Sequence, residues 1–140
     1  KPTEIFVDAI GLGAGVADRL RELGLPAYAI NVSESPAMGE HYLNLRAELW
    51  YKAKSWLEGR DVRIPKDELL KTELTTVRYA YTSTGRVKIE AKADLKRRGV
   101  ASPDSADAFV LTFASDAGTA MGGRGSGYMS KIKRNLVGVV

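Results

Sequence analysis

Residues 4 to 32 read EIFVDAIGLGAGVADRLRELGLPAYAINV, and this stretch decides the fold class. It opens with a short apolar run that ends in a carboxylate, which predicts a buried strand over 4–8. A glycine turn over 11–15 follows, then a helix that stops at Gly24, and then a second strand over 27–32. Because the order is strand, helix, strand, the strands are predicted to be parallel with a right-handed crossover. The chain is therefore predicted to be an α/β protein.

Helical and alternating patterns predict the elements that follow. These are helices over 41–58, 65–73, 92–98 and 102–115, and strands over 77–82 and 86–91. The two strands flank Ser83-Thr84-Gly85, which predicts a β-hairpin. Ser102 followed by Pro103 is a typical helix start, with serine as the cap. The last helix is predicted to bury Ala106, Phe109, Val110 and Phe113.

Composition limits the chemistry that this chain can perform. Its 140 residues suit one domain, and no apolar run approaches the roughly 18 residues of a membrane helix. The absence of cysteine excludes disulfides, thiol catalysis and cysteine-ligated zinc, and the single histidine, His41, excludes a multi-histidine metal site. Hydrolytic chemistry would therefore depend on carboxylates and on hard metals with oxygen ligands.

The net charge of +4 is unevenly placed. The segment 86–98 holds six basic and two acidic residues, and residues 117–140 hold four basic residues and no acidic one. Two basic patches beside an otherwise acidic body indicate a polyanion partner. The alternative is a solvated surface and a glycine-rich, flexible tail over 117–140.

Three aspartates are the candidate metal ligands. Asp8 ends the first predicted strand, where open α/β sheets bind ligands, although it could also cap the turn that follows. Asp104 and Asp107 share one face of the last helix, so their charges repel unless a cation joins them. The helix dipole alone can explain a carboxylate at position 104, in the first turn. Asp107 lies close to the buried face, where a carboxylate is usually paired or bound to a metal. Together the three fit a magnesium or manganese site of the two-metal phosphodiesterase kind.

The glycine turn offers a different function, nucleotide binding. Gly11, Gly13 and Gly15 lie between a strand and a helix, but Val16 occupies the place of the third fingerprint glycine. The second strand also lacks a terminal acidic residue. A tight strand–helix connection is the better interpretation, and we expect no nucleotide cofactor.

Four sequence blocks together resemble a known family. They are VDAIGLGAGVADRL over 7–20, YLNLRAELW over 42–50, KIEAK over 88–92 and SPDSADAFVLT over 102–112. In order and spacing they resemble the C-terminal nuclease domain of the large terminase subunit of tailed bacteriophages and prophages, over residues 4–116. The resemblance implies a ribonuclease H-like fold, with a mixed sheet flanked by helices and an added β-hairpin.

The resemblance also implies an activity and a site. The activity is Mg²⁺- or Mn²⁺-dependent endonucleolytic cleavage of concatemeric double-stranded viral DNA during packaging, in the cytoplasm of the bacterial host. Asp8 would bind metal, as would Asp104, Asp107 or both. The basic residues flanking the DNA path would be Lys88, Lys92, Lys96, Arg97 and Arg98. Implied partners are the terminase ATPase domain, the small terminase subunit and the portal protein, with no membrane.

The family's first catalytic aspartate lies on a strand that should precede Lys1, so we expect an N-terminally truncated domain over 1–116 with an incomplete metal site. The alternative function is a non-catalytic DNA-binding or portal-docking module of the same fold. Within the second block, Arg46 and Glu48 are interpreted as ion pairs that orient the long helix, and Trp50 and Trp56 as core residues.

Overall fold

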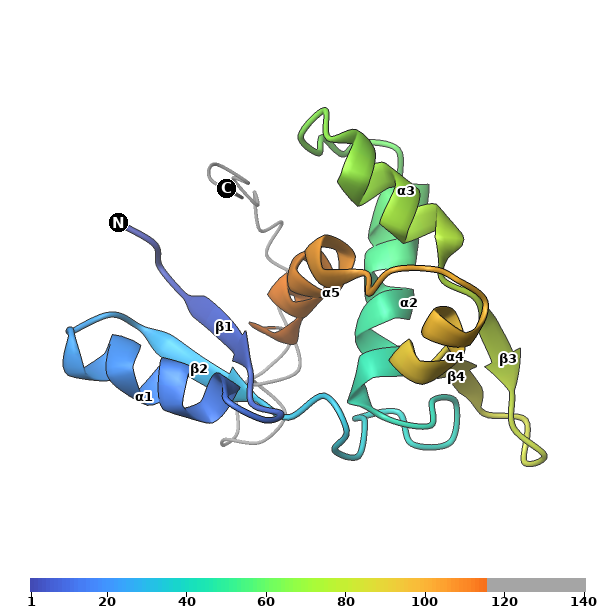
Figure 1. Ribbon diagram of the computed structural model, residues 1–140, viewed down its shortest axis with the longest axis horizontal. Helices are drawn as coiled ribbons and strands as arrows, with labels where there is room; N and C mark the ends of the chain where they lie inside the picture. Colours follow the sequence, from blue (N-terminus) through green and yellow to red (C-terminus); the bar gives the residue numbers. More distant parts are fainter. Residues whose placement is uncertain (116–140) are drawn as a thin grey trace.

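The computed structural model describes residues 1–115 and begins with a β–α–β unit (Figure 1). Strand β1 spans Ile5–Asp8, helix α1 spans Gly13–Glu22 and strand β2 spans Ala27–Ile30. The two strands are parallel, with Ile5 opposite Ala27 and Asp8 opposite Ile30. The predicted parallel pair is therefore confirmed.

Close packing explains the glycine turn between β1 and α1. Gly11 has a φ of 71°, in the left-handed region that glycine tolerates best. A Cβ atom at Gly13 would overlap the carbonyl oxygen of Asp8. The Asp8 carboxylate accepts a hydrogen bond from the Ile10 amide at 3.0 Å and so holds the start of the turn. The turn is thus the tight strand–helix connection that the sequence favoured.

Helices α2 and α3 begin later than predicted, because asparagine and aspartate caps set their first residues. Helix α2 spans Leu45–Glu58, with the side chain of Asn44 accepting from the Ala47 amide. The preceding residues 41–43 form a bridge to Val87 and no helical turn of α2: the Leu43 amide donates to the Val87 carbonyl and the Val87 amide donates to the His41 carbonyl, at 2.8 Å each. Helix α3 spans Glu68–Thr76 and is capped by the Asp67 carboxylate.

The predicted hairpin and basic helix are confirmed. Strand β3 spans Tyr79–Tyr81, strand β4 spans Val87–Ile89, and the two are antiparallel. Helix α4, over Lys92–Arg97, follows directly. Within residues 1–115 the strands of the expected mixed sheet form two separate two-stranded sheets, β1–β2 and β3–β4.

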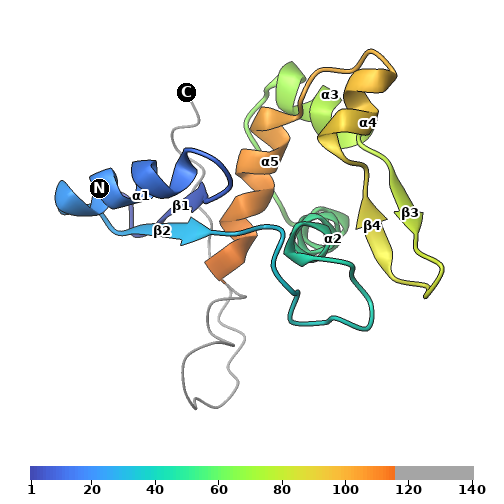
Figure 2. The same cartoon turned by 60° about the horizontal axis from the view of Figure 1, so that its bottom comes forward.

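Helix α5, over Asp104–Leu111, lies in the middle of the fold and continues into a 3₁₀ turn, η1, over Thr112–Ala114. It contacts α2, α3 and β1 and separates the β–α–β unit from α2 and the hairpin (Figure 2). The core consists of Leu49, Trp50, Ala53, Leu70, Ala106, Phe109, Val110, Leu111, Phe113 and Ala114. The buried face predicted for the last helix is confirmed, while the tail predicted over 117–140 lies outside the described residues.

The start of α5 differs from the sequence prediction. Ser102 does not cap the helix: its hydroxyl donates to the Asp104 carboxylate at 2.7 Å. The cap comes instead from α3, where Glu73 accepts a hydrogen bond from the buried Ala106 amide at 2.8 Å. The prediction was wrong because a residue distant in the chain satisfies the amide that a local serine was expected to bind.

We therefore predict that Glu73→Ala lowers the free energy of unfolding by about 1–3 kcal/mol, since it leaves a buried amide unpaired. Glu73→Gln keeps an acceptor and should lose less. Ser102→Ala should change stability by only about 0.5 kcal/mol or less, as is usual for exposed positions. Urea denaturation of the three variants measures this order, and a larger loss in Ser102→Ala than in Glu73→Ala would contradict the assignment of the cap.

Candidate active site

One cavity of about 680 Å³ gathers the candidate residues from four elements. Its lining includes Asp8 at the end of β1 and Arg46 and Trp50 on α2. It also includes Lys92 at the start of α4, and Asp104 and Asp107 in the first turn of α5. All three predicted metal-ligating aspartates therefore face the same cavity, although they come from opposite ends of the described chain.

Asp107 is the most firmly held of the three carboxylates. Its Oδ1 accepts from the Arg46 guanidinium at 3.0 Å and from the Trp50 indole nitrogen at 3.1 Å. The Arg46 guanidinium also donates to the Glu90 carbonyl at 2.8 Å, which fixes the arginine between α2 and β4. Because Arg46 and Trp50 mainly occupy Oδ1, Oδ2 is left facing Lys92.

Lys92 joins the two aspartates of α5. Its ammonium nitrogen lies 3.3 Å from Asp107 Oδ2 and 3.4 Å from Asp104 Oδ1. The repulsion expected between these carboxylates is thus relieved by a shared positive charge. The hydrogen bond from the Ser102 hydroxyl lowers the pKa of Asp104 despite partial burial, and the Lys92 ammonium lowers it further. Asp104 is therefore an anion at neutral pH.

The aspartates differ in their access to solvent. The side chain of Asp104 is 77% exposed and that of Asp107 is 22% exposed. Asp8 lines the same cavity, and its carboxylate accepts a hydrogen bond from the Ile10 amide. A ligand entering from solvent would reach Asp104 first.

The donor set suits a hard divalent cation in chemistry, since it is made of carboxylate oxygens. The shared Lys92 ammonium shows that Asp104 and Asp107 lie close enough for one cation to interact with both. Within residues 1–115, no group of three or more aspartate, glutamate, histidine or cysteine side chains converges closely enough to hold a metal ion. The fit therefore rests on the two carboxylates of Asp104 and Asp107, and Asp8 lines the same cavity.

The sequence reasoning assigned Arg46 and Trp50 to helix orientation and to the core, and both assignments are confirmed. Arg46 forms an interhelical ion pair, Glu48 pairs with Lys52 at 2.9 Å within α2, and Trp50 is buried. Their direct contact with Asp107 was missed. The sequence feature that indicated this contact is the spacing of Arg46 and Trp50, because residues four apart lie on the same face of a helix and can contact the same group. A buried indole N–H also requires an acceptor.

The basic residues predicted to flank DNA have different environments. Lys88 and Lys96 are exposed, and Lys92 contacts the two aspartates. Arg97 pairs with Asp94 on the same helix. Arg98 pairs with Glu90 at 2.7 Å and donates to the Thr76 carbonyl at 2.8 Å, so it connects α4 to β4 and α3.

Solved structures of a domain from one bacterial virus have a similar fold. The nuclease domain of the large terminase subunit gp2 of bacterial virus Sf6 aligns with a TM-score of 0.67 over 79% of this chain, at 23% identity. A lysine-to-alanine variant of that domain with manganese gives the same three values, as does the variant with calcium. This chain spans 65% of the length of the manganese-bound structure. No protein-family model and no curated protein matches the chain.

The chain therefore has the ribonuclease H-like α/β fold of terminase nuclease domains, as the sequence blocks implied. Within residues 1–115, every helix is too short or too polar to cross a membrane.

The Glu90–Arg98 pair generates a prediction about pH. The hydrogen bond from Arg98 lowers the pKa of Glu90 to about 2 despite partial burial, and the Arg78 amide contributes. Since unfolded glutamate titrates near 4.3, this carboxylate stabilises the fold above that pH, and the contribution is lost as the pH falls toward 2. Glu90→Gln should thus be less stable than the wild type at pH 7, and the difference should shrink between about pH 5 and pH 2.

Thermal unfolding across this pH range provides the measurement. Glu22→Gln is a matched control, because Glu22 pairs with Arg19 on the exposed face of α1. Its stability difference from the wild type should stay small throughout. A gap for Glu90→Gln that is constant with pH would contradict the role given to this ion pair.

Proposed function

We propose that this chain is the nuclease module of a phage DNA-packaging terminase, a Mg²⁺- or Mn²⁺-dependent endodeoxyribonuclease that cleaves concatemeric double-stranded DNA. The observation that supports it best is that Asp8, Asp104 and Asp107 line one cavity. The fold is shared with terminase nuclease domains, and the Sf6 variant domain was solved with manganese and with calcium. Both facts favour divalent metal chemistry at these carboxylates.

The proposed ligands are the carboxylates of Asp8, Asp104 and Asp107. Two divalent ions, when bound, would polarise the scissile phosphodiester and lower the pKa of an attacking water. Arg46 and Trp50 would keep Asp107 oriented toward the cavity, since they hold its Oδ1. Lys92 would neutralise Asp104 and Asp107 when no other cation is present, because it already contacts both.

The proposed DNA surface is the basic side of the hairpin and α4, adjacent to the aspartate cavity. Lys88, Lys92, Lys96 and Arg97 would contact phosphates, and contacts of this kind position DNA without reading its sequence. Arg98 would act mainly through Glu90, which it orients. A duplex on this surface would bring a phosphate to Asp104, the most exposed of the three aspartates.

A second function is a DNA-binding or portal-docking module without catalysis. One observation favours it: within residues 1–115, no three carboxylates converge on a common ion position. On either proposal the chain would act in the cytoplasm of an infected bacterium. Its partners there would be the terminase ATPase domain, the small terminase subunit and the portal protein.

Manganese binding separates the two functions. Mn²⁺ is a paramagnetic ion, so titration should broaden the amide signals of Asp8, Asp104 and Asp107 before others in NMR spectra. Asp8→Asn and Asp104→Asn should each weaken binding at least several-fold in calorimetry. Lys92→Ala should strengthen it, because removing a positive charge beside two carboxylates favours another cation.

Asp18→Asn is the matched control for this titration, since Asp18 pairs with Arg21 on α1, outside the cavity lining. If Mn²⁺ affinity is equal in the wild type, Asp104→Asn and Asp18→Asn, the metal-dependent function is wrong and the binding-module function is preferred.

DNA binding should be sequence-independent and salt-dependent. If three or four phosphates are neutralised, log affinity should fall with log salt with a slope of about −3 to −4. Replacing Lys92, Lys96 and Arg97 by alanine should flatten this slope and weaken all sequences alike. The measurement is fluorescence anisotropy with two unrelated duplexes over a range of salt concentrations.

A control variant with equal loss of charge replaces Arg19, Arg63 and Lys71 by alanine, on other parts of the chain. It should bind nearly as the wild type does. Deleting residues 117–140 tests the alternative that the basic tail carries the binding. Loss of affinity on that deletion, with normal binding by the α4 variant, would remove α4 from the DNA surface.

A further inference from the structure

The outer edge of strand β3 has no partner strand within residues 1–115. Strand β4 is enclosed, since it pairs with β3 on one side and, through Val87, with His41 and Leu43 on the other. In the described part of the chain, strand β3 pairs with β4 alone. An edge of this kind presents unpaired backbone N–H and C=O groups that can bind another strand.

The register identifies which backbone groups face outward. The Glu90 amide donates to the Arg78 carbonyl, and the Thr82 amide donates to the Arg86 carbonyl, each at 2.8 Å. In an antiparallel ladder hydrogen-bonded pairs alternate with non-hydrogen-bonded pairs. Tyr79 and Tyr81 are therefore in non-hydrogen-bonded pairs, and their amides and carbonyls point away from β4.

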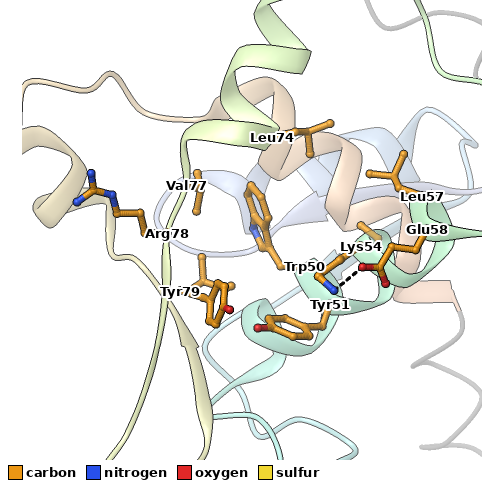
Figure 3. Close-up of a pocket in the computed structure, with 11 residues that line it drawn as sticks. Trp50, Tyr51, Lys54, Leu57, Glu58, Leu74, Val77, Arg78 and Tyr79 are labelled. Carbon is orange, nitrogen blue, oxygen red and sulfur yellow. Dashed lines mark hydrogen bonds and ion pairs between the residues drawn. The ribbon is translucent and has the colours of Figure 1, made fainter.

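An apolar cavity of about 340 Å³ lies next to this edge (Figure 3). Its lining comes from α2, the end of α3 and the inner face of the hairpin, and includes Trp50, Leu57, Leu74, Val77, Tyr79 and Ile89. Tyr79 packs edge-on against Tyr51 at 5.8 Å between ring centroids. Lys54 and Glu58 form an ion pair at 2.6 Å among the lining residues.

The edge is apolar on the face that carries the cavity. Tyr79 and Tyr81 are 56% and 64% exposed, and their ring centroids are 6.0 Å apart. Protected edge strands commonly carry charged residues or proline instead. Two exposed tyrosines with outward-facing backbone groups leave both apolar surface and hydrogen-bonding capacity unused.

Charge distinguishes the occupants that could use this edge. Arg78 and Lys88 are exposed on the hairpin, and Arg78 borders the apolar cavity with its side chain pointing away from Trp50 and Tyr51 in Figure 3. A second copy of this chain would bring two basic hairpin faces together, which is unfavourable. An acidic partner would be attracted to the same face.

We propose that β3 binds an extended segment of a partner protein as a third strand, with acidic and apolar residues alternating along that segment. Successive side chains of a strand point to opposite faces. The apolar side chains would cover Tyr79, Tyr81 and the mouth of the cavity, and the acidic side chains would lie beside Arg78. Backbone hydrogen bonds to Tyr79 and Tyr81 provide affinity and the alternating side chains provide specificity, as in other strand-addition complexes. This interaction requires neither metal nor DNA, so it can be tested without the nuclease proposal, although Lys88 belongs to both proposed surfaces.

The probe for this test is a fluorescein-labelled heptapeptide in which glutamate alternates with valine and phenylalanine. It should bind the full 140-residue chain in fluorescence anisotropy, and a scrambled peptide of the same composition should bind more weakly. Hydrogen exchange should slow at the Tyr79 and Tyr81 amides when the peptide is added. The Ala80 amide faces β4, so its exchange should change less.

Two variants of Tyr81 isolate the backbone contact. Tyr81→Pro and Tyr81→Ala both remove the ring, but only proline removes the outward N–H, and proline is tolerated where an edge N–H faces solvent. Tyr81→Pro should bind the peptide about 3–10-fold more weakly than Tyr81→Ala, the loss expected for one hydrogen bond. Protection of the Ala80 amide in both variants would verify that the hairpin remains folded.

Charge reversal tests the proposed partner chemistry. Arg78→Glu should weaken the glutamate peptide and strengthen a peptide with lysine in place of glutamate. The proposal is overturned if Tyr81→Pro and Tyr81→Ala bind equally or if the Tyr79 and Tyr81 amides stay unprotected. It is also overturned if duplex DNA or self-association of the chain, instead of the peptide, protects them.

Discussion

The arrangement of this protein depends on the ion pair between Arg46 and Asp107. Arg46 on α2 donates to the Asp107 carboxylate on α5 and to the Glu90 carbonyl at the end of the hairpin. One guanidinium thereby joins three elements that are distant in the sequence. Arginine suits this position because its planar, permanently charged group can donate several hydrogen bonds at fixed angles. Removing Asp107 would take away the carboxylate that pairs with the Arg46 guanidinium, whereas removing Arg46 would leave Lys92 as the cation beside Asp107.

The same contact determines what the cavity can do. With Oδ1 of Asp107 held by Arg46 and Trp50, the aspartate keeps a defined orientation toward Asp104 and Lys92. Lys92 then serves as the counter-charge for both carboxylates. In the proposed function, a divalent cation would replace the Lys92 ammonium as the counter-charge of both carboxylates.

Trp50 separates two surfaces of different character. It lines the aspartate cavity and also the apolar cavity beside β3 (Figure 3). The first cavity is bordered by carboxylates and basic residues and suits phosphate and cations. The second is bordered mainly by aromatic and aliphatic residues, together with the Lys54–Glu58 ion pair and Arg78, and lies beside the edge proposed to bind a peptide. One buried indole on α2 therefore borders both cavities.

The sequence alone determined the local elements and the chemistry that is possible. Apolar periodicity predicted the β–α–β unit, the hairpin and the buried face of α5, because these patterns depend on residues close in the chain. The four blocks implied the ribonuclease H-like fold, which the solved structures bear out. The lack of cysteine and the single histidine left carboxylates as the candidate ligands.

Only the tertiary structure decided how distant residues meet. Asp8 and Asp107 reach one cavity because α5 packs against β1. Glu73, and not Ser102, accepts the hydrogen bond from the Ala106 amide at the start of α5. Arg46 pairs with Asp107. In both contacts the two residues are far apart in the sequence. The sequence could not predict these contacts because neither partner shows in its own neighbourhood which distant group will satisfy it. Hydrogen-bonding groups and charges pair with groups that are close in the folded structure, whereas apolar periodicity depends only on residues that are close in the sequence.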